Sequence, residues 1–142
     1  MIKHIMIPYD QSEPASRALE FATDLAIKYD SKISIVTCIV PQVPMNPVMS
    51  ASYAETLVSM RKNAADAVSE IESKIKGLGI PAKAEILEGV SVSNELLSYA
   101  ESHQVDLIVM GSRGLGGFKK LLLGSVAGSV SQHSTCPVLI VK

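Results

Sequence analysis

Glycine and serine residues in the last third of the chain have the spacing of an anion-binding site. The sequence contains Gly111-Ser112-Arg113-Gly114, then nine residues, then Gly124-Ser125-Val126-Ala127. Glycine lets the backbone turn tightly and approach a ligand closely. The first N–H groups of a helix have no partner within the helix, and the helix dipole favours negative charge there. The segment therefore predicts a phosphate-binding cradle in which the N–H groups of Ser125 and Val126 face the phosphates.

Two features of this segment leave alternatives open. Its glycines could serve the ligand or only turn the chain between a strand and a helix. Arg113, Lys119 and Lys120 lie in the same loop and could shield a polyphosphate or form a solvated basic face. If the cradle is real, we expect a side chain at Gly114 or Gly124 to fill phosphate space and to be penalised by a positive φ.

A second loop carries an acidic group. Pro8-Tyr9-Asp10 follows the first apolar segment of the chain. The Asp10 carboxylate could contact a ligand, cap the helix that follows, or do both. No histidine or other carboxylate stands out as a base near the glycine segment, so we predict no catalytic residue.

Alternating hydrophobic patterns predict the elements that hold these two loops. Short β-branched runs indicate strands, and apolar residues three and four apart indicate helices. Three prolines between residues 41 and 47 predict an irregular loop from Pro41 to Ser52. The expected strands are 2–7, 32–40, 82–87, 105–110 and 136–141, and the expected helices are 14–29, 53–76, 91–103 and 125–133.

The order of these elements predicts the fold class. Strands that alternate with helices form a parallel sheet with helices on both faces. We expect one α/β domain over residues 1–142, Rossmann-like and doubly wound, with strand order 3-2-1-4-5. Ligands of such sheets bind beyond the carboxyl ends of the strands, where the strand order reverses. The loops after strands one and four, which carry Asp10 and Gly111, should meet there.

Composition excludes several classes of function. The chain has 13 basic and 14 acidic residues, so it offers no basic surface for nucleic acid or for an anionic membrane. No apolar run approaches the ~20 residues that span a bilayer, and we expect a cytoplasmic protein. Cys38 and Cys136 are expected to be small buried hydrophobes. His4, His103 and His133 lack partners at metal-ligand or catalytic spacing and are expected to be structural.

The glycine spacing and its flanking segments resemble the ATP-binding branch of the universal stress protein family. The resemblance rests on G-x-x-G, nine residues and G-S, and it extends over essentially the whole chain. Three further segments share the resemblance. Pro8-Tyr9-Asp10-Gln11-Ser12-Glu13 is similar to the family's P-x-D-G-S loop. Residues 105–114 and 136–141 are similar to its fourth and fifth strands. Here Gln11 replaces the commoner glycine and Tyr9 a smaller residue.

The resemblance implies a role for individual residues. Pro8, Tyr9 and Asp10 would flank the adenosine end of a bound nucleotide. Ile39 would give adenine a main-chain contact. The ribose and phosphate side would be lined by Met110, Gly111, Arg113 and Gly114, and the phosphates would be held by Gly124, Ser125 and Val126.

The function expected from these observations is binding of ATP, with Mg²⁺, by a regulatory protein of the stress response whose nucleotide state is read by a protein partner. The alternative is a slow ATPase or nucleotidyl-transfer enzyme on the same fold. G-x-x-x-x-G-K-[ST] is absent, and so is G-x-G-x-x-G after the first strand. A phosphoacceptor domain would need an acidic cluster for metal and a lysine-bearing loop after the last strand, whereas only Asp10 is suitable and no such lysine loop appears.

The last apolar run also predicts self-association. Val138, Leu139, Ile140 and Val141 end one position before the C-terminus. As a bare sheet edge they would expose unpaired backbone groups and an apolar strip. A two-fold pairing with the same strand of a second copy would satisfy both, and the family resemblance points the same way. The alternative is a strand that is buried within its own sheet.

Overall fold

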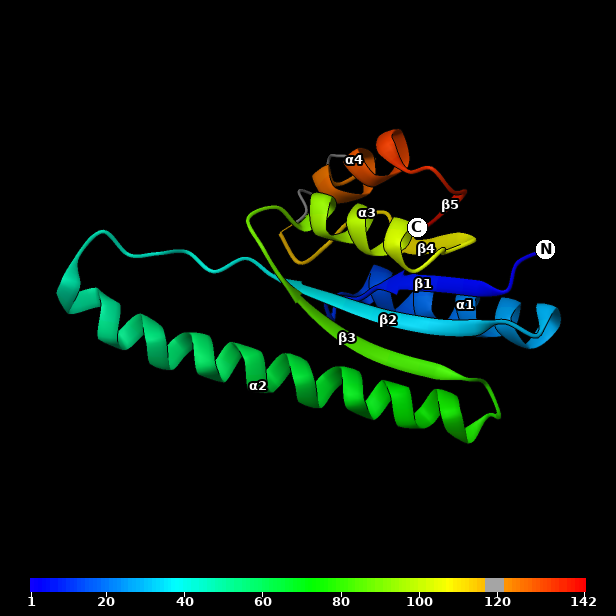
Figure 1. The fold of residues 1–142 in the computed structure, drawn as a ribbon, viewed down its shortest axis with the longest axis horizontal. Helices are drawn as coiled ribbons and strands as arrows, with labels where there is room; N and C mark the ends of the chain where they lie inside the picture. The colour runs from blue at the N-terminus through cyan, green and yellow to red at the C-terminus, as the bar shows by residue number, and fades with distance from the viewer. Residues whose placement is uncertain (117–121) are drawn as a thin grey trace.

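The computed structural model describes residues 1–116 and 122–142, and for residues 47 and 48 it describes the backbone only. Within this part of the chain, strands and helices alternate as the sequence predicts (Figure 1). Their bounds are β1 (His4–Pro8), α1 (Glu13–Tyr29), β2 (Lys32–Ile39), α2 (Pro47–Gly77), β3 (Ala82–Glu88), α3 (Val92–Ser102), β4 (Leu107–Gly111), α4 (Ser125–His133) and β5 (Val138–Val141).

All strand pairs in the sheet are parallel, and the strand order is β3-β2-β1-β4-β5. This confirms the predicted fold class and strand order. From β1 the chain adds β2 and β3 on one side and then β4 and β5 on the other, so the strand order reverses between β1 and β4. The carboxyl ends of these two strands lie side by side. Strand β5 forms one edge of the sheet and is not buried between two strands.

Two apolar layers cover the sheet, one on each face. Ile5 and Ile7 of β1 point toward α1 and α2, whereas Met6 between them points toward α3 and α4. This alternation follows from the two-residue period of a strand. Small side chains on α1 bring the helix close to the sheet; the buried ones are Ala15, Ala18, Ala22 and Ala26.

Helix α2 is longer than the sequence suggests. It begins at Pro47 and not at Tyr53, so the irregular loop is shorter than the predicted 41–52. Proline is tolerated in the first turn of a helix, where its missing N–H would have no partner. The carbonyl of Asn46 accepts hydrogen bonds from the N–H groups of Met49 and Ser50. The first half of the helix extends beyond the sheet (Figure 1).

Three strands begin later than their apolar runs. Strand β1 starts at His4, β4 at Leu107 and β5 at Val138. Before β4, the N–H of Val105 donates to the carbonyl of Ala100, which closes the end of α3. Hydrophobic residues in these positions pack against the core without joining the ladder. Periodicity therefore overestimates the strand by two residues at each of these starts.

Candidate functional site

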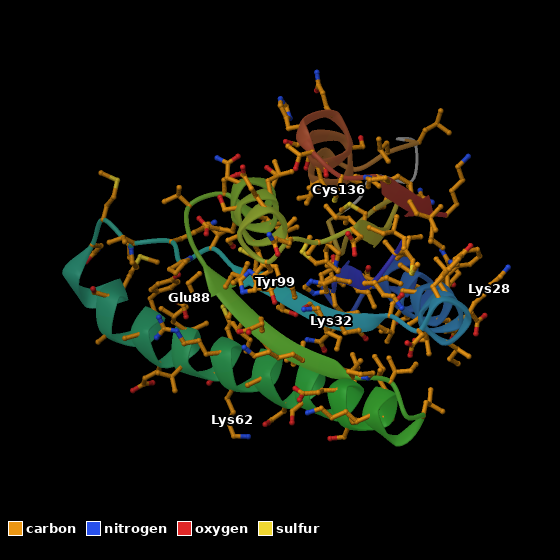
Figure 2. The ribbon with its side chains drawn as sticks, turned by 45° about the vertical axis from the view of Figure 1, so that its right-hand side comes forward. Lys28, Lys32, Lys62, Glu88, Tyr99 and Cys136 are labelled. Atoms are coloured by element: carbon orange, nitrogen blue, oxygen red, sulfur yellow. The ribbon has the colours of Figure 1, made fainter. Side chains whose placement is uncertain are left out.

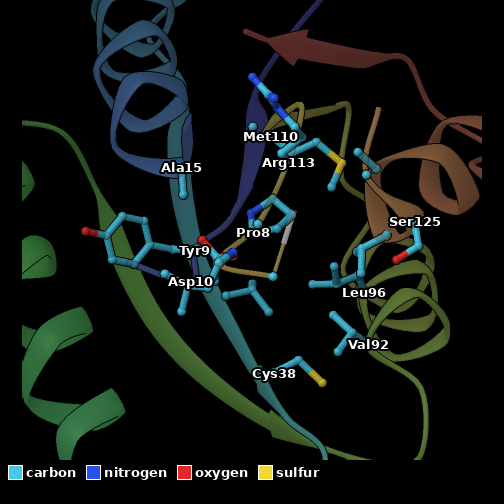
Figure 3. A pocket seen from close by; sticks show the side chains of 18 residues that line it. Pro8, Tyr9, Asp10, Ala15, Cys38, Val92, Leu96, Met110, Arg113 and Ser125 are labelled. Atoms are coloured by element: carbon cyan, nitrogen blue, oxygen red, sulfur yellow. The ribbon is translucent and has the colours of Figure 1, made fainter. Parts of the chain in front are cut away.

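A cavity of about 600 Å³ lies at the carboxyl ends of β1 and β4 (Figure 3). Its walls come from the loop after β1, the end of β4, the start of α4, strand β2 and helix α3. The predicted site residues that line it are Pro8, Tyr9, Asp10, Met110, Gly111, Arg113, Gly114, Gly124, Ser125 and Val126. The two predicted loops thus meet at the position where the strand order reverses.

Ile39 is the predicted site residue that does not line the cavity. It is 6% exposed, and its carbonyl accepts a hydrogen bond of 3.2 Å from the N–H of Gly89. The predicted contact of its main chain with adenine remains a prediction. Lys119 and Lys120 lie outside the described residues.

Asp10 links the two loops that form the cavity. Its Oδ1 accepts a hydrogen bond from the N–H of Ser12 at 3.0 Å, and its Oδ2 accepts one from the N–H of Leu115 at 3.2 Å. The N-cap of α1 is Ser12, whose hydroxyl oxygen accepts from the N–H of Ala15. Asp10 therefore holds the glycine segment against the loop after β1, and Ser12 takes the capping role.

The three glycines that were predicted to serve a ligand have different surroundings. A Cβ at Gly111 would lie 2.7 Å from the backbone carbon of Pro14, so this glycine permits the close approach of α1 to β4. A Cβ at Gly114 would lie 2.6 Å from Oδ2 of Asp10, and one at Gly124 would lie 3.3 Å from Cα of Arg113.

None of these three glycines has a positive φ. The expected conformational penalty at Gly114 and Gly124 is therefore wrong. Space is what limits a side chain at these positions.

The first turn of α4 is open to the cavity. Its N-cap is Gly124, at φ −71° and ψ 162°, and no side chain caps it among the described residues. The first intrahelical bond runs from the N–H of Gly128 to the carbonyl of Gly124 at 2.8 Å. The N–H groups of Ser125 and Val126 therefore lack helical acceptors. Together with the positive end of the helix dipole, they suit an anion in the cavity.

Part of the cavity wall is apolar. It is formed by Val36 and Cys38 of β2 and by Val92 and Leu96 of α3, and Figure 3 shows Leu96 and Val92 near Ser125. Sequence reasoning missed these four residues. Their spacing carried a usable signal, because Val36 and Cys38 lie two apart on a strand, and Val92 and Leu96 lie four apart on a helix.

Two side chains near this wall differ from expectation. Cys38 is half-buried on the cavity wall and not a core residue. Burial and the nearby Glu95 raise the pKa of its thiol. The ring of Tyr9 packs partly against the core below α1 and α2, and Figure 3 shows it directed away from Cys38 and Leu96.

The described part of the chain contains no group of three His, Cys, Asp or Glu side chains that could hold a metal ion. Within the same residues, no helix combines the length and the apolar character that crossing a bilayer requires.

Comparison with known proteins identifies relatives over the full length of the chain. The model of the universal stress protein family matches residues 1–142. Universal stress protein YxiE of Bacillus subtilis is 33% identical over 156 residues, which cover all of both chains. Universal stress protein MJ0531 of Methanocaldococcus jannaschii is 32% identical and covers all of this chain, which spans 83% of that protein.

Solved structures share the fold. The universal stress protein UspA from Lactobacillus plantarum superposes with a TM-score of 0.89 at 23% identity, covering 99% of this chain and 97% of that one. A universal stress protein solved in complex with cAMP has a TM-score of 0.74 at 24% identity, covering 99% and 97%. One from Archaeoglobus fulgidus, in complex with dAMP, has a TM-score of 0.69 at 19% identity, covering 100% and 98%.

Proposed function

The chain belongs to the universal stress protein family, and we propose that it binds ATP in the cavity between the loops after β1 and β4. The observation that carries this proposal is the uncapped start of α4, which opens into a cavity whose wall is apolar at Val36, Cys38, Val92 and Leu96. Phosphates bind to the N–H groups of Ser125 and Val126. The adenosine lies toward Val36, Cys38 and Leu96, beside Asp10. This arrangement makes one end of the cavity suitable for an anion and the other for an aromatic base.

The size of the cavity agrees with this ligand. At about 600 Å³ it lies within the range of roughly 300–1,000 Å³ that small-molecule sites occupy. Two proteins of the same fold were solved with cAMP and dAMP, which are both adenine nucleotides. These ligands support an adenine nucleotide as the class of ligand, and the helix start suits its phosphates.

Mg²⁺ accompanies the triphosphate in this proposal. The nearest acidic residue of the site is Asp10, and both of its oxygens already accept backbone hydrogen bonds. Phosphate oxygens and water therefore hold the ion, as they usually do for Mg²⁺ bound to nucleotides.

We place the protein among regulatory proteins of the cytoplasm, with residues 1–142 acting as one domain whose nucleotide state a protein partner reads. Hydrolysis needs a positioned water and stabilised transition-state charge, whereas binding needs only the cradle. We expect turnover below about 1 s⁻¹, the low end of typical enzymes. Release of phosphate faster than that would favour the alternative, a slow ATPase or nucleotidyl-transfer enzyme.

The test of ATP binding is mass spectrometry of nucleotide that is released when freshly purified protein is denatured. We expect ATP or its hydrolysis product, and calorimetric titration of the stripped protein should then show binding of Mg-ATP. A stripped, folded protein that binds neither ATP nor another adenine nucleotide would overturn the proposal.

The second part of the proposal is a homodimer formed through β5. This strand is an edge of the sheet, and all four of its residues are half-buried. The carbonyls of Pro137 and Val141 accept hydrogen bonds from the β4 side, so the backbone of Ile140 faces the open edge. A second copy of β5 would pair with these outward groups.

Ile140→Pro tests this interface with little damage to the sheet. It deletes an N–H that faces outward, and proline is tolerated on such an edge. The dimer should weaken in sedimentation analysis. Leu139→Pro is the contrasting variant, because it removes an N–H on the β4 side and should lower the stability of the fold itself. A wild-type chain that sediments as a monomer at micromolar concentration would refute the dimer.

A further inference from the structure

Three polar side chains lie buried between the sheet and α3. They are His4 of β1, Ser34 of β2 and Tyr99 of α3, and their exposed fractions are 4%, 4% and 6%. Tyr99 lies between α3 and the sheet in Figure 2. This buried triad joins three different elements and lies outside the cavity.

Hydrogen bonds fix the protonation state of the triad. Nδ1 of His4 lies 3.1 Å from the carbonyl oxygen of His103, which can only accept, so Nδ1 carries the proton. Nε2 of His4 is then an acceptor, and the hydroxyl of Ser34 donates to it at 2.8 Å. The hydroxyl of Tyr99 donates to Oγ of Ser34 at 3.2 Å. Every polar atom of the triad is satisfied while His4 is neutral.

A second proton on His4 would break this chain of donors. Nε2–H would have to donate to Oγ of Ser34, and the hydroxyl hydrogen of Ser34 would then need a new acceptor. Among the described residues, Ser34 is the only hydrogen-bond partner of the Tyr99 hydroxyl. A buried donor without an acceptor is costly, so protonation of His4 disfavours the packing of Tyr99 and Ser34 between α3 and the sheet.

The surrounding charges act on His4 from several elements. Burial lowers the pKa of His4 below its ordinary 6.5, and the neighbouring Lys32 and the His103 imidazole act in the same direction. The hydrogen bond to the His103 carbonyl raises the pKa of His4, and so does the carboxylate of Asp106, which accepts from the N–H of His4 at 2.9 Å.

Further titratable groups lie near Tyr99. Lys83 and Glu85 form an ion pair on β3, and the pKa of Lys83 is raised mainly by Glu85 and also by Tyr99. The ring of His103 stacks on Tyr99 at a centroid distance of 3.9 Å. His103 is thus a second histidine at this end of α3, and a test must separate it from His4.

Helix α3 connects the triad to the cavity. Val92 and Leu96 line the cavity, and Tyr99 follows Leu96 by three residues on the same buried face. Ala100 lies on this face as well, packed in the same core cluster. A shift of Tyr99 away from Ser34 therefore moves the wall of the cavity.

We propose that His4, Ser34 and Tyr99 form a proton-sensitive anchor of α3, so that acidification opens the α3 wall and speeds the release of bound nucleotide. The release of nucleotide rests on the proposed function of the cavity, whereas the anchor itself does not. His4, Ser34 and Tyr99 are positioning residues, because they act on the ligand through α3.

The size of the effect follows from one proton. The pKa of His4 in the closed state lies below its ordinary 6.5, and opening removes the burial that lowers it. The population of the open state therefore rises as the pH falls, by at most about tenfold between about pH 7.5 and about pH 5.5. The sign is fixed because the open state binds more protons than the closed state in this range.

The first measurement needs no ligand. Hydrogen exchange of the α3 amides, corrected for the intrinsic dependence of exchange on pH, should show protection falling by up to about tenfold over this range. Amides of α1, which packs on the other face of the sheet, serve as the internal reference. Protection of α3 that does not change with pH would overturn the anchor.

The second measurement is release of methylanthraniloyl-ATP after dilution into excess ATP. Wild-type release should accelerate up to about tenfold over the same range. His4→Gln keeps an amide donor and an acceptor but cannot gain a proton, so its release rate should change less than about twofold. The ligand phosphates titrate alike for both proteins, so the difference between the two belongs to His4.

Matched variants separate the histidines and guard against a folding defect. His133→Asn, at the exposed end of α4, should behave like wild type, and so should His103→Gln. Tyr99→Phe keeps the ring and removes the link to Ser34, so the dependence of α3 protection on pH should disappear even if His4→Gln does not fold. A full wild-type response in Tyr99→Phe, or loss of the response in His103→Gln, would refute the proposal.

The proposed function and the anchor can fail separately. A wild-type chain that binds no nucleotide would refute the proposed function, and hydrogen exchange of the α3 amides would still test the anchor.

Discussion

Helices α1 and α4 both begin at the carboxyl edge of the sheet, but their first turns are completed differently. The hydroxyl of Ser12 caps α1, and Pro14 in its first turn has no N–H to satisfy. Helix α4 begins after Gly124, and no side chain among the described residues caps it. The α1 start is complete within the protein, whereas the α4 start presents donors to the cavity. The same kind of helix end is thus closed by the protein in one place and left open to a cavity in the other.

The largest expected effect comes from filling the α4 start. In Gly124→Val, the new side chain lies 3.3 Å or less from the backbone of Arg113 and occupies phosphate space. We expect ATP affinity in calorimetry to fall by at least about a hundredfold, or ~2.7 kcal/mol. The φ of −71° is accessible to valine, so the fold should persist.

Gly128→Ala is the control on the same helix. A Cβ there lies 3.8 Å from Leu123, an ordinary contact. It should leave ATP affinity unchanged and stabilise α4 by up to about 1 kcal/mol. A folded Gly124→Val protein with wild-type affinity would show that the α4 start does not hold the phosphates.

The next effect concerns the packing of the α1 start against β4. In Gly111→Ala, the Cβ lies 2.7 Å from Pro14 and 2.9 Å from the backbone nitrogen of Ala15. Backbone cannot move aside as a side chain does, so we expect a loss of about 1–3 kcal/mol in the free energy of unfolding, measured in urea. Gly116→Ala, with open space around its Cβ, should cost much less. Equal stability of the two variants would disprove the close approach.

A smaller effect separates stability from binding. Ser12→Ala removes the cap of α1 and should cost about 1 kcal/mol of stability, with ATP affinity unchanged within about twofold. Ser91→Ala should cost less, because its hydroxyl lies 3.5 Å from the N–H of Asn94, compared with 3.2 Å for Ser12 and Ala15. Loss of ATP binding in a stable Ser12→Ala protein would contradict the division between the two helix starts.

The smallest effect is a gain. Gln11 has a φ of 65°, in the left-handed region that favours glycine. Gln11→Gly relieves this strain but adds flexibility to the unfolded chain, so we expect a net gain of about 0.5 kcal/mol. Gln104→Gly, at φ 51° and far from the cavity, should give a similar gain. Thermal unfolding measures both, and destabilisation by Gln11→Gly would contradict the strain.

The sequence was sufficient to predict the order of strands and helices and the proximity of the loops after β1 and β4. Both depend on periodicity and on the handedness of parallel crossovers, which need no knowledge of side-chain positions. The start of α4 at Ser125 and the edge position of β3 were predicted for the same reason. Boundaries were less accurate where a proline or an apolar residue could belong to either neighbour, as at Pro47 and Val105.

The apolar wall of the cavity could not be predicted in the same way. Val92, Leu96 and Cys38 read as core residues, and only their position at the open end of the sheet makes them cavity residues. The close approach of α1 to Gly111 could not be predicted either, because Pro14 and Ala15 lie almost a hundred positions away in the sequence. The sequence predicted a structural role for His4, but its hydrogen bond to Ser34, and the link through Ser34 to Tyr99, could not be identified before the fold was known.

Helix α2 carries a consequence for how the molecule opens. Its buried side chains are Ala64, Val68, Ile71 and Ile75, and residues 49–63 bury none. The bidentate contact of Arg61 with Glu88 is the described ion pair that ties the middle of the helix to β3. Short isolated helices are marginally stable in water. Protection of the backbone amides from hydrogen exchange should therefore rise along α2 toward its C-terminal half. We expect the outer turns of α2 to open while the end of the sheet that carries the cavity stays intact.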